Sequence, residues 1–212
     1  MNHFELINKC LVELNYKTCN SFTDLIKNDH EKIKNIINIV NAEVCGSDNW
    51  NFLLRKLQIF LPKNTGEIKN TIQGRLHSIY IDGIKYEYFS DFEKFFLNKQ
   101  PSRTFSVFND KILFPIFTEN KKVEIVYYTN YFAQNENGED IPSMKEEKDM
   151  SVIPLPFAEP ILVYGTCMRL KGNSEYSKFS YWYGMYKDSL ASLRSKISSN
   201  AFETPSIKII RN

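Results

Sequence analysis

The sequence predicts an α+β fold in which an antiparallel bundle of N- and C-terminal helices carries an inserted all-β module, either a sandwich or a barrel. Two observations predict it. Near both ends of the 212-residue chain, apolar residues recur at steps of three and four, which is the period of an amphipathic helix. Between these regions the period becomes two, and Pro, Gly and Asn interrupt it as they do between strands.

Two helices are predicted before residue 48. The first carries an apolar stripe made of Phe4, Ile7, Leu11 and Leu14. The second carries a stripe made of Ile33, Ile36, Ile37, Val40 and Val44. Ser21 or Asn28 can cap the chain before the second helix, and Glu31 follows Asn28 at the spacing of a capping box. Gly46 is typical of a helix end, so we expect this helix to run to about Cys45.

The β module is predicted from two hairpins and one long strand. Asp82-Gly83 lies between two β-prone runs, and this dipeptide favours the positive φ angles of a type I′ turn. A second hairpin is expected across Asn109-Asp110. Residues 91–97 form a short helical connector between the hairpins, and Val123 to Phe132 is a β-branched and aromatic strand.

The segment 134–150 is acidic. It contains six acidic residues and two lysines, a net charge of −4, together with Gly138 and Pro142. Because few apolar residues are available to offset its ordering entropy, we expect a mobile loop that can be shortened without unfolding the protein.

After Pro154 and Pro156 the helical period returns. One helix is predicted up to Gly172, with its apolar face on Phe157, Ile161, Tyr164 and Met168. The last helix has the most regular pattern in the chain, formed by Tyr176, Phe179, Tyr183, Tyr186, Leu190, Leu193 and Ile197. We expect Leu190→Asp to destabilise this helix severely and Lys187→Ala to have little effect on folding.

These elements divide the chain into three parts. A discontinuous helical domain comprises residues 1–48 and 154–200. The β module comprises residues 49–153 and includes the acidic loop 134–150. An extended tail comprises residues 201–212.

The formal net charge of +2 gives no strong electrostatic attraction to nucleic acid or anionic lipid. Charge is unevenly distributed, however, and the last quarter of the chain is basic, with eight Lys and Arg residues against three acids from Arg169 onward. The four cysteines show no CxxC spacing and are expected to be reduced thiols. Neither a leader peptide nor a membrane-spanning run is predicted, so we expect a protein that is made in the cytoplasm and has no membrane partner.

No motif of a reaction centre occurs in the sequence. His3, His30 and His77 have no ligand partners at metal-site spacing, and the sequence contains no nucleophile elbow, dinucleotide motif or Walker lysine. The expected protein therefore has no catalytic residue, no cofactor-binding residue and no metal ligand.

The aromatic residues of the last helix allow two interpretations. Rings at steps of three and four favour a packing seam in the core or at a subunit interface. The alternative is a small nucleic-acid-binding module, in which rings between Tyr176 and Tyr186 stack on bases beside the basic residues of the same helix. Lys187, Arg194 and Lys196 lie mostly off the seam, where they form either a solvated face or a face toward a DNA channel.

Several segments together resemble one protein family over nearly the whole chain. They are Phe4-Glu5-Leu6-Ile7-Asn8-Lys9-Cys10-Leu11, Asp48-Asn49-Trp50-Asn51-Phe52-Leu53, Ile81-Asp82-Gly83, Val123-Glu124-Ile125-Val126-Tyr127-Tyr128, Ile153-Pro154-Leu155-Pro156-Phe157, Val163-Tyr164-Gly165, Tyr186 to Leu190 and Leu193-Arg194. In this order they resemble the head-to-tail adaptor, or head-completion, proteins of tailed bacteriophages, which include the tail tubular protein A type.

This resemblance implies a structural virion protein with no enzymatic activity. Members of the family form a ring, commonly of twelve copies, at the neck of the virion between the portal protein above and the tail nozzle or tail tube below. Double-stranded DNA passes through the lumen during genome packaging and ejection. The family helices typically build the ring beside the portal, which gives Lys187, Arg194 and Lys196 a channel-facing role.

The tail residues Ile207, Lys208, Ile209, Ile210 and Arg211 are the expected partner-binding residues. Three isoleucines after the helix-ending Pro205 are too few to form a core, and their β-branched side chains favour a strand added to the portal or to a neighbouring subunit. The other outcome is that they fold back on their own helices. Beside the ring adaptor, two classes of function stay open, namely the nucleic-acid-binding module and an enzyme whose residues assemble only in three dimensions.

Overall fold

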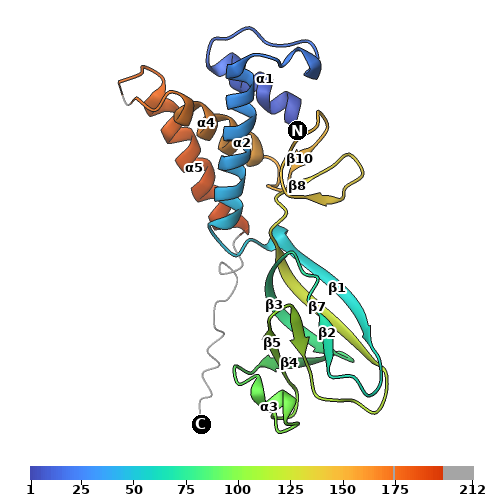
Figure 1. Cartoon of the computed structure of the whole chain (residues 1–212). Coiled ribbons are helices and arrows are strands. Elements are labelled where there is room, and N and C mark those ends of the chain that lie inside the picture. The colour runs from blue at the N-terminus through green and yellow to red at the C-terminus, as the bar shows by residue number, and fades with distance from the viewer. Residues whose placement is uncertain (174, 198–212) are drawn as a thin grey trace, which may run out of the picture. The chain divides into compact units, whose positions relative to one another are not determined.

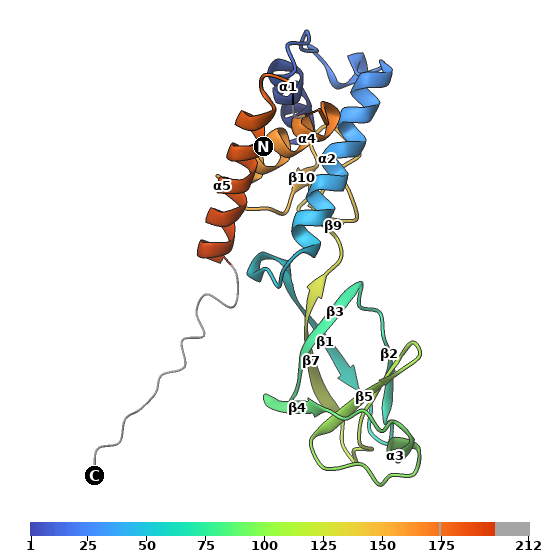
Figure 2. The same ribbon diagram turned by 90° about the vertical axis from the view of Figure 1, so that its left-hand side faces the viewer.

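The computed structural model describes residues 1–173 and 175–197, and Figure 1 and Figure 2 show it in two orientations. The fold is mixed α+β, and the described residues contain five α-helices and a nearly closed, barrel-like sheet of seven strands. The chain forms two compact units. Unit 1 comprises Met1–Leu53 and the described part of Tyr131–Asn212, and unit 2 comprises Leu54–Asn130.

Unit 1 contains four long helices. They are α1 (His3–Glu13), α2 (Asn28–Gly46), α4 (Ala158–Leu170) and α5 (Phe179–Ile197). The central helix is α4, which contacts each of the other three. Gly165 allows this, because a Cβ atom built there would lie 2.9 Å from Cγ1 of Val40 in α2 and 3.0 Å from the Tyr186 ring in α5.

The helix ends differ in detail from the sequence predictions. Asn2 caps α1 through a capping box, in which Asn2 Oδ1 accepts from the Glu5 amide and Glu5 accepts from the Asn2 amide. Asn28, in contrast, is the first residue of α2 instead of its cap, so the predicted pairing with Glu31 does not form. At the other end of α2, the Val44 carbonyl accepts from the indole N–H of the buried Trp50 at 2.7 Å and from the Ser47 hydroxyl at 2.9 Å, at a helix end where carbonyls lack partners within the helix.

The acidic segment is folded, which differs from the expected mobile loop. It lies within unit 1 rather than in the β module and contributes a three-stranded sheet in the order β10-β8-β9. The strands are β8 (Ala133–Gln134), β9 (Asp140–Ile141) and β10 (Met150–Ser151). Asn38 in α2 donates to the Met144 carbonyl at 2.8 Å and accepts from the Met144 amide at 2.9 Å. These two hydrogen bonds and the burial of Met144 hold the segment against α2.

Unit 2 contains the seven-stranded sheet, in the order β1-β7-β3-β4-β5-β6-β2. The strands are β1 (Leu54–Leu61), β2 (Glu67–Lys69), β3 (Gly74–Ile81), β4 (Ile84–Tyr88), β5 (Thr104–Phe108), β6 (Lys111–Leu113) and β7 (Lys121–Thr129). Both predicted hairpins are present, with positive φ angles at Asp82, Gly83 and Asn109. All neighbouring strands are antiparallel except β4 and β5, which are parallel and are connected through the short helix α3 (Glu93–Phe96).

The core of unit 2 lies on the inner face of this sheet. Its fully buried residues include Leu61, Ile79, Ile112, Val123 and Ile125. Leu61, Val123 and Ile125 follow the alternation of β1 and β7, which is the period of two that predicted the module. In β3 a register shift between Leu76 and Ser78 breaks the alternation, so that Ser78 and Ile79 are both buried. The tail residues Ile207, Lys208, Ile209, Ile210 and Arg211 lie outside the described residues.

Candidate functional site

The candidate site is the exposed surface of α5, where the sequence analysis placed its aromatic and basic residues. This helix of 19 residues packs on α4 but buries only Trp182 and Leu193 among its described side chains. The sequence had predicted a continuous packing seam. Tyr183, which belongs to that predicted seam, is instead 49% exposed, and Leu190 is half-buried. Tyr181, which lies outside the predicted seam, is 52% exposed.

The N-terminal turn of α5 is attached to the end of α1. The indole Nε1 of Trp182 donates to Oε2 of Glu13 at 3.0 Å, and the Tyr176 ring stacks on the indole at 5.4 Å. Lys178 donates to the Glu13 carbonyl at 2.9 Å. The ammonium group thus lies against carbonyls at the negative end of α1, where a cation is stabilised by the helix dipole.

A pair of tyrosines joins α4 and α5. The hydroxyl oxygens of Tyr164 and Tyr181 are 3.3 Å apart, and their rings pack edge to face at 5.6 Å. The hydrogen bond with Tyr181, together with burial, raises the pKa of the Tyr164 hydroxyl well above its ordinary value. The Tyr164 hydroxyl therefore stays protonated at neutral pH, and the pair orients the two helices rather than acting as a base.

The three basic residues predicted to face a channel do not lie on one face. Lys187 and Arg194 are seven residues apart, close to two helical turns, so they project from the same side of α5. Lys196 is nine residues from Lys187, on the opposite side, and its Nζ lies 5.7 Å from the centre of the Phe157 ring. A cation over a ring is attracted by the negative face of the π system, which directs Lys196 toward its own helical unit.

Tyr183, Lys187 and Arg194 share the solvent-facing side of α5, and we call these three residues the outer face. Tyr183 stacks on Phe179 with nearly parallel rings 6.5 Å apart. Among the described residues, neither Lys187 nor Arg194 forms an ion pair, and both are exposed. The outer face combines a large exposed ring with two cations. Such a face can bind either a protein partner or the phosphate backbone of a nucleic acid.

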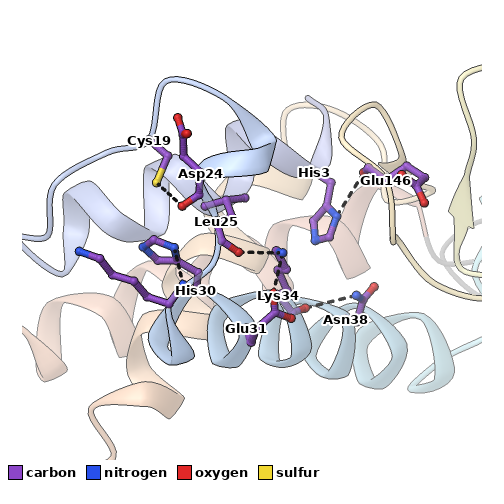
Figure 3. A network of polar contacts seen from close by, with 10 residues as sticks. His3, Cys19, Asp24, Leu25, His30, Glu31, Lys34, Asn38 and Glu146 are labelled. Carbon is purple, nitrogen blue, oxygen red and sulfur yellow. Dashed lines mark hydrogen bonds and ion pairs between the residues drawn. The ribbon is translucent and has the colours of Figure 1, made fainter.

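A second polar region lies where α1, α2 and the acidic segment meet, as Figure 3 shows. Lys34 donates to the Leu25 carbonyl at 3.3 Å and to the Glu31 carboxylate at 2.8 Å. The His3 ring is buried, with Nδ1 3.3 Å from the Glu146 carbonyl, and its Nε2 has no hydrogen-bond partner among the described residues. Burial lowers the pKa of His3, so the ring is neutral at pH 7.

In the same region, one carboxylate of the acidic segment is buried and hydrogen-bonded within the fold. Asp149 is buried, and its Oδ2 accepts from the backbone amides of Lys145 at 2.6 Å and Glu146 at 2.8 Å. The Asp149 carbonyl accepts from the His3 amide at 2.7 Å. The Asp149 carboxylate therefore closes a local turn, and the Asp149 backbone carbonyl joins that turn to the start of α1. A count of charges could not predict this role.

A shallow cavity of about 230 Å³ opens beside the ends of α1 and α4 and is lined in part by Tyr16, Asp29 and Lys171. Lys171 Nζ lies 5.4 Å from the centre of the Tyr16 ring and 3.2 Å from its hydroxyl. The hydrogen bond to Tyr16 raises the pKa of Lys171. Lys171 and Tyr16 are therefore each other's polar partners. No local pattern in the sequence predicts this contact, because 155 positions separate the two residues.

The described residues contain no cluster of three or more His, Cys, Asp or Glu side chains arranged to hold a metal ion. Cys10 and Cys167 are buried beside each other, and Cys45 is buried in α2. Burial raises the pKa of the Cys10 and Cys45 thiols, which disfavours the reactive thiolate form. Each helix in the described ranges is also too short or too polar to cross a bilayer.

In comparisons with known proteins, no protein-family model and no curated protein sequence matches this chain.

Proposed function

We propose that the protein is a non-enzymatic structural subunit of a tailed-phage virion. It forms a ring, of twelve copies as in the family that its sequence resembles, which docks beneath the portal and links it to the tail. The genome passes through the lumen of this ring during packaging and ejection. In this proposal the protein assembles in the host cytoplasm and resides at the neck of the virion.

The observation that carries the proposal is the exposure of α5. A helix of 19 residues that fully buries only Trp182 and Leu193 leaves most of its surface to be covered by a partner. Tyr181 and Tyr183 are half exposed there, and tyrosine is enriched at protein interfaces because it offers apolar area and a polar tip. In the proposed ring, α1, α2, α4 and α5 act as an antiparallel bundle, and α5 packs against the neighbouring copy.

Unit 2 supports a second contact in the same assembly. Its exposed large side chains include Phe60, Tyr88 and Leu97, and Phe60 is 68% exposed. Apolar groups left in water on both units favour a protein that is completed by other subunits. The proposed neighbours are the portal protein on one side and the tail nozzle or tail tube on the other.

Lys187 and Arg194 lie about one and three helical turns beyond Tyr183 on the outer face. We assign this later part of α5 to the lumen, whereas the turn that carries Tyr183 contacts the neighbouring copy. The rise of an α-helix separates the Cα atoms of Lys187 and Arg194 by about 10 Å along one side of α5. In the ring these cations attract the phosphate backbone of double-stranded DNA without reading its sequence. Lys196, whose ammonium group lies over Phe157, is not part of this proposed surface.

The test is co-sedimentation of the purified protein with portal-containing heads, followed by negative-stain electron microscopy of the bound fraction. We expect rings beneath the portal with the wild-type chain. Tyr183→Glu should leave the thermal transition of the monomer unchanged but prevent ring formation. Asn35→Glu, at an exposed position of α2, adds the same charge elsewhere and serves as the control. If the wild-type protein neither binds heads nor forms rings, the adaptor proposal is wrong.

The outer face also favours a second candidate, the nucleic-acid-binding module. Tyr183 beside Lys187 and Arg194 provides a ring for stacking and two cations for phosphates. Fluorescence anisotropy with labelled single-stranded DNA separates the candidates. Tight binding by the monomer, falling steeply with salt and weakened by Tyr183→Ala, would favour the module over the adaptor.

A further inference from the structure

The end of unit 1 where α1 stops and α2 begins carries two adjoining cavities. The first, of about 230 Å³, lies beside the ends of α1 and α4. The second, of about 270 Å³, opens between the start of α2 and the loop that follows α1. Tyr16 and Asp29 line both cavities, so we treat the two as one site and call it the basic site. Its four lysines and one aspartate, which together give a charge of +3, are Lys17, Lys27, Lys32, Lys171 and Asp29.

The positive charge of the basic site is only partly neutralised within the chain. Lys32 pairs with Asp29 at 3.5 Å, and both side chains are exposed. Lys17 and Lys27 are exposed as well, and neither forms an ion pair with any described residue. The Tyr16 ring, which lines both cavities, is 40% exposed. Unpaired cations beside an exposed ring favour a partner surface that is anionic.

The acidic segment of the same chain, with its net charge of −4, presents the opposite charge on an ordered turn. Glu146 and Glu147 are exposed, and neither forms an ion pair within the described part of the chain. Asp149 Oδ2 accepts from the amides of Lys145 and Glu146, so hydrogen bonds close the turn that carries both glutamates. Carboxylates on such a turn lose little backbone freedom when a partner binds them.

The two charged surfaces lie on opposite sides of α2. Lys32, which lines the basic site, and Lys34 are two residues apart, which corresponds to about 200° around a helix. Lys34 lies with Asn38 on the side where Figure 3 shows Glu146, and Asn38 holds Met144 of the acidic segment on that side. One copy therefore presents its positive and negative surfaces to two different neighbours.

We propose that the basic site of one copy binds the acidic segment of the next copy in a head-to-tail contact. Complementary surfaces on opposite sides of one unit form a heterologous interface, and such an interface generates a closed ring when the rotation between copies closes. The inference rests on the proposed function, because it names the second surface through which the copies of that ring meet.

The basic site adjoins the part of α5 that contacts the neighbouring copy in the proposed ring. Lys171 Nζ lies 5.9 Å from the centre of the Tyr176 ring, and that ring stacks on Trp182 of α5. Tyr183 is the next residue of the helix. The apolar contact of Tyr183 and the ionic contact of the basic site can thus belong to one continuous interface.

Charge in this contact determines orientation more than affinity. Single exposed ion pairs contribute only about 0–1 kcal/mol, whereas like charges placed opposite each other oppose binding strongly. Reversing the charge on one surface should therefore prevent assembly. Reversing the charge on both surfaces should permit it again.

Two full-length variants test the contact by charge reversal. One carries Lys17→Glu with Lys27→Glu, and the other carries Glu146→Lys with Glu147→Lys. Each is mixed with portal-containing heads, and rings are counted by negative-stain electron microscopy after co-sedimentation. We expect each variant alone to form fewer rings by about tenfold or more, because like charges then meet at every contact. An equimolar mixture should restore the rings, since alternating copies are complementary at every contact.

The mixture also controls for folding, because a variant that fails to fold cannot be restored by mixing. A chain that carries all four substitutions should form rings without a partner, for the same reason. The matched control, Lys63→Glu with Lys85→Glu, makes the same change of charge at two exposed positions of unit 2 and should assemble as the wild-type protein does.

Each outcome decides a separate question. Wild-type numbers of rings with both variants would overturn the contact and leave the adaptor proposal standing. Loss of rings that neither the mixture nor the fourfold variant restores would show that the two surfaces do not meet, which also overturns it. Loss with the lysine variant alone would assign the basic site to another anion, such as the phosphate groups of DNA, and would overturn the inference. Absence of rings and of head binding with the wild-type chain would instead overturn the proposed function.

Discussion

Trp182 of α5 and Glu13 of α1 are joined by a hydrogen bond of 3.0 Å between the indole Nε1 and Oε2 of the carboxylate. Trp182 is fully buried, so the bond connects two helices that are far apart in sequence through a charged acceptor. Hydrogen bonds to charged groups contribute more to stability than those between neutral groups.

Trp182→Phe should therefore lower the free energy of unfolding by about 2 kcal/mol or more, from the lost hydrogen bond and the smaller ring. Glu13→Gln should cost less, because an amide oxygen still accepts from the indole. Chemical denaturation followed by circular dichroism measures both. Equal losses for the two variants would mean that the carboxylate charge, not the indole, matters most.

The position most sensitive to a charge on α5 is Leu193. The helical spacing of the sequence predicts Leu190 as the sensitive position, but Leu193 is fully buried and Leu190 is only half-buried. We expect Leu193→Asp to destabilise the protein by about 3–5 kcal/mol and Leu190→Asp by clearly less, since burial of an unpaired charge dominates the cost. Lys187→Ala should be nearly silent in the same thermal melts. A larger effect at Leu190 would contradict the observed helix face.

Gly165 and Gly184 form a matched pair on neighbouring helices. A Cβ atom at position 165 would lie 2.9 Å from Val40, whereas nothing lies within 4 Å of one at position 184. Gly165→Ala should cost about 1–3 kcal/mol through overpacking, while Gly184→Ala should stabilise α5 by about 0.5–1 kcal/mol through helix propensity. Thermal unfolding of the two variants checks both signs.

The stability of unit 1 should depend on the protonation of His3. Burial holds the pKa of folded His3 below 6.5, so the unfolded chain binds a proton more readily in this range. The contribution of the neutral ring is fully present above about pH 6.5 and is lost as pH falls toward the folded pKa. Burial is the largest of these effects and opposes the protonated form, as does Lys34. The hydrogen bond with the Glu146 carbonyl and the charges of Asp149 and Glu31 favour it.

The measurement is the free energy of unfolding of the wild-type protein and of His3→Gln at pH 7.5 and pH 5.5. The wild-type protein should lose more stability than the variant over this interval, because glutamine does not titrate. An equal loss in both proteins would assign the pH dependence to other groups. His30 and His77 remain in both proteins and cancel in the comparison.

The acidic segment should not be removable without cost, contrary to the expectation from composition. Asn38→Ala leaves both the amide and the carbonyl of the buried Met144 without their partners and should destabilise the protein by about 1–3 kcal/mol. Glu147→Ala, at an exposed position of the same segment, is the control and should change stability little. If Asn38→Ala is also silent, the segment is not anchored through this residue.

The sequence by itself determined the elements with a strong period. The α+β class, the Asp82-Gly83 hairpin and the final amphipathic helix follow from spacing and turn chemistry, which act over a few residues. Helical spacing also contains the information that separates Lys187 and Arg194 from Lys196, since nine residues correspond to two and a half turns.

Only the tertiary structure decided how these elements pack on one another and which of their side chains are buried. The folding of the acidic segment depends on Asn38, which lies 106 positions away from Met144, and on the backbone amides that surround Asp149. Which side of α5 is covered depends on where Gly165 allows close approach. Such features arise from contacts between distant residues, and no local pattern specifies them because burial is a property of the assembled fold.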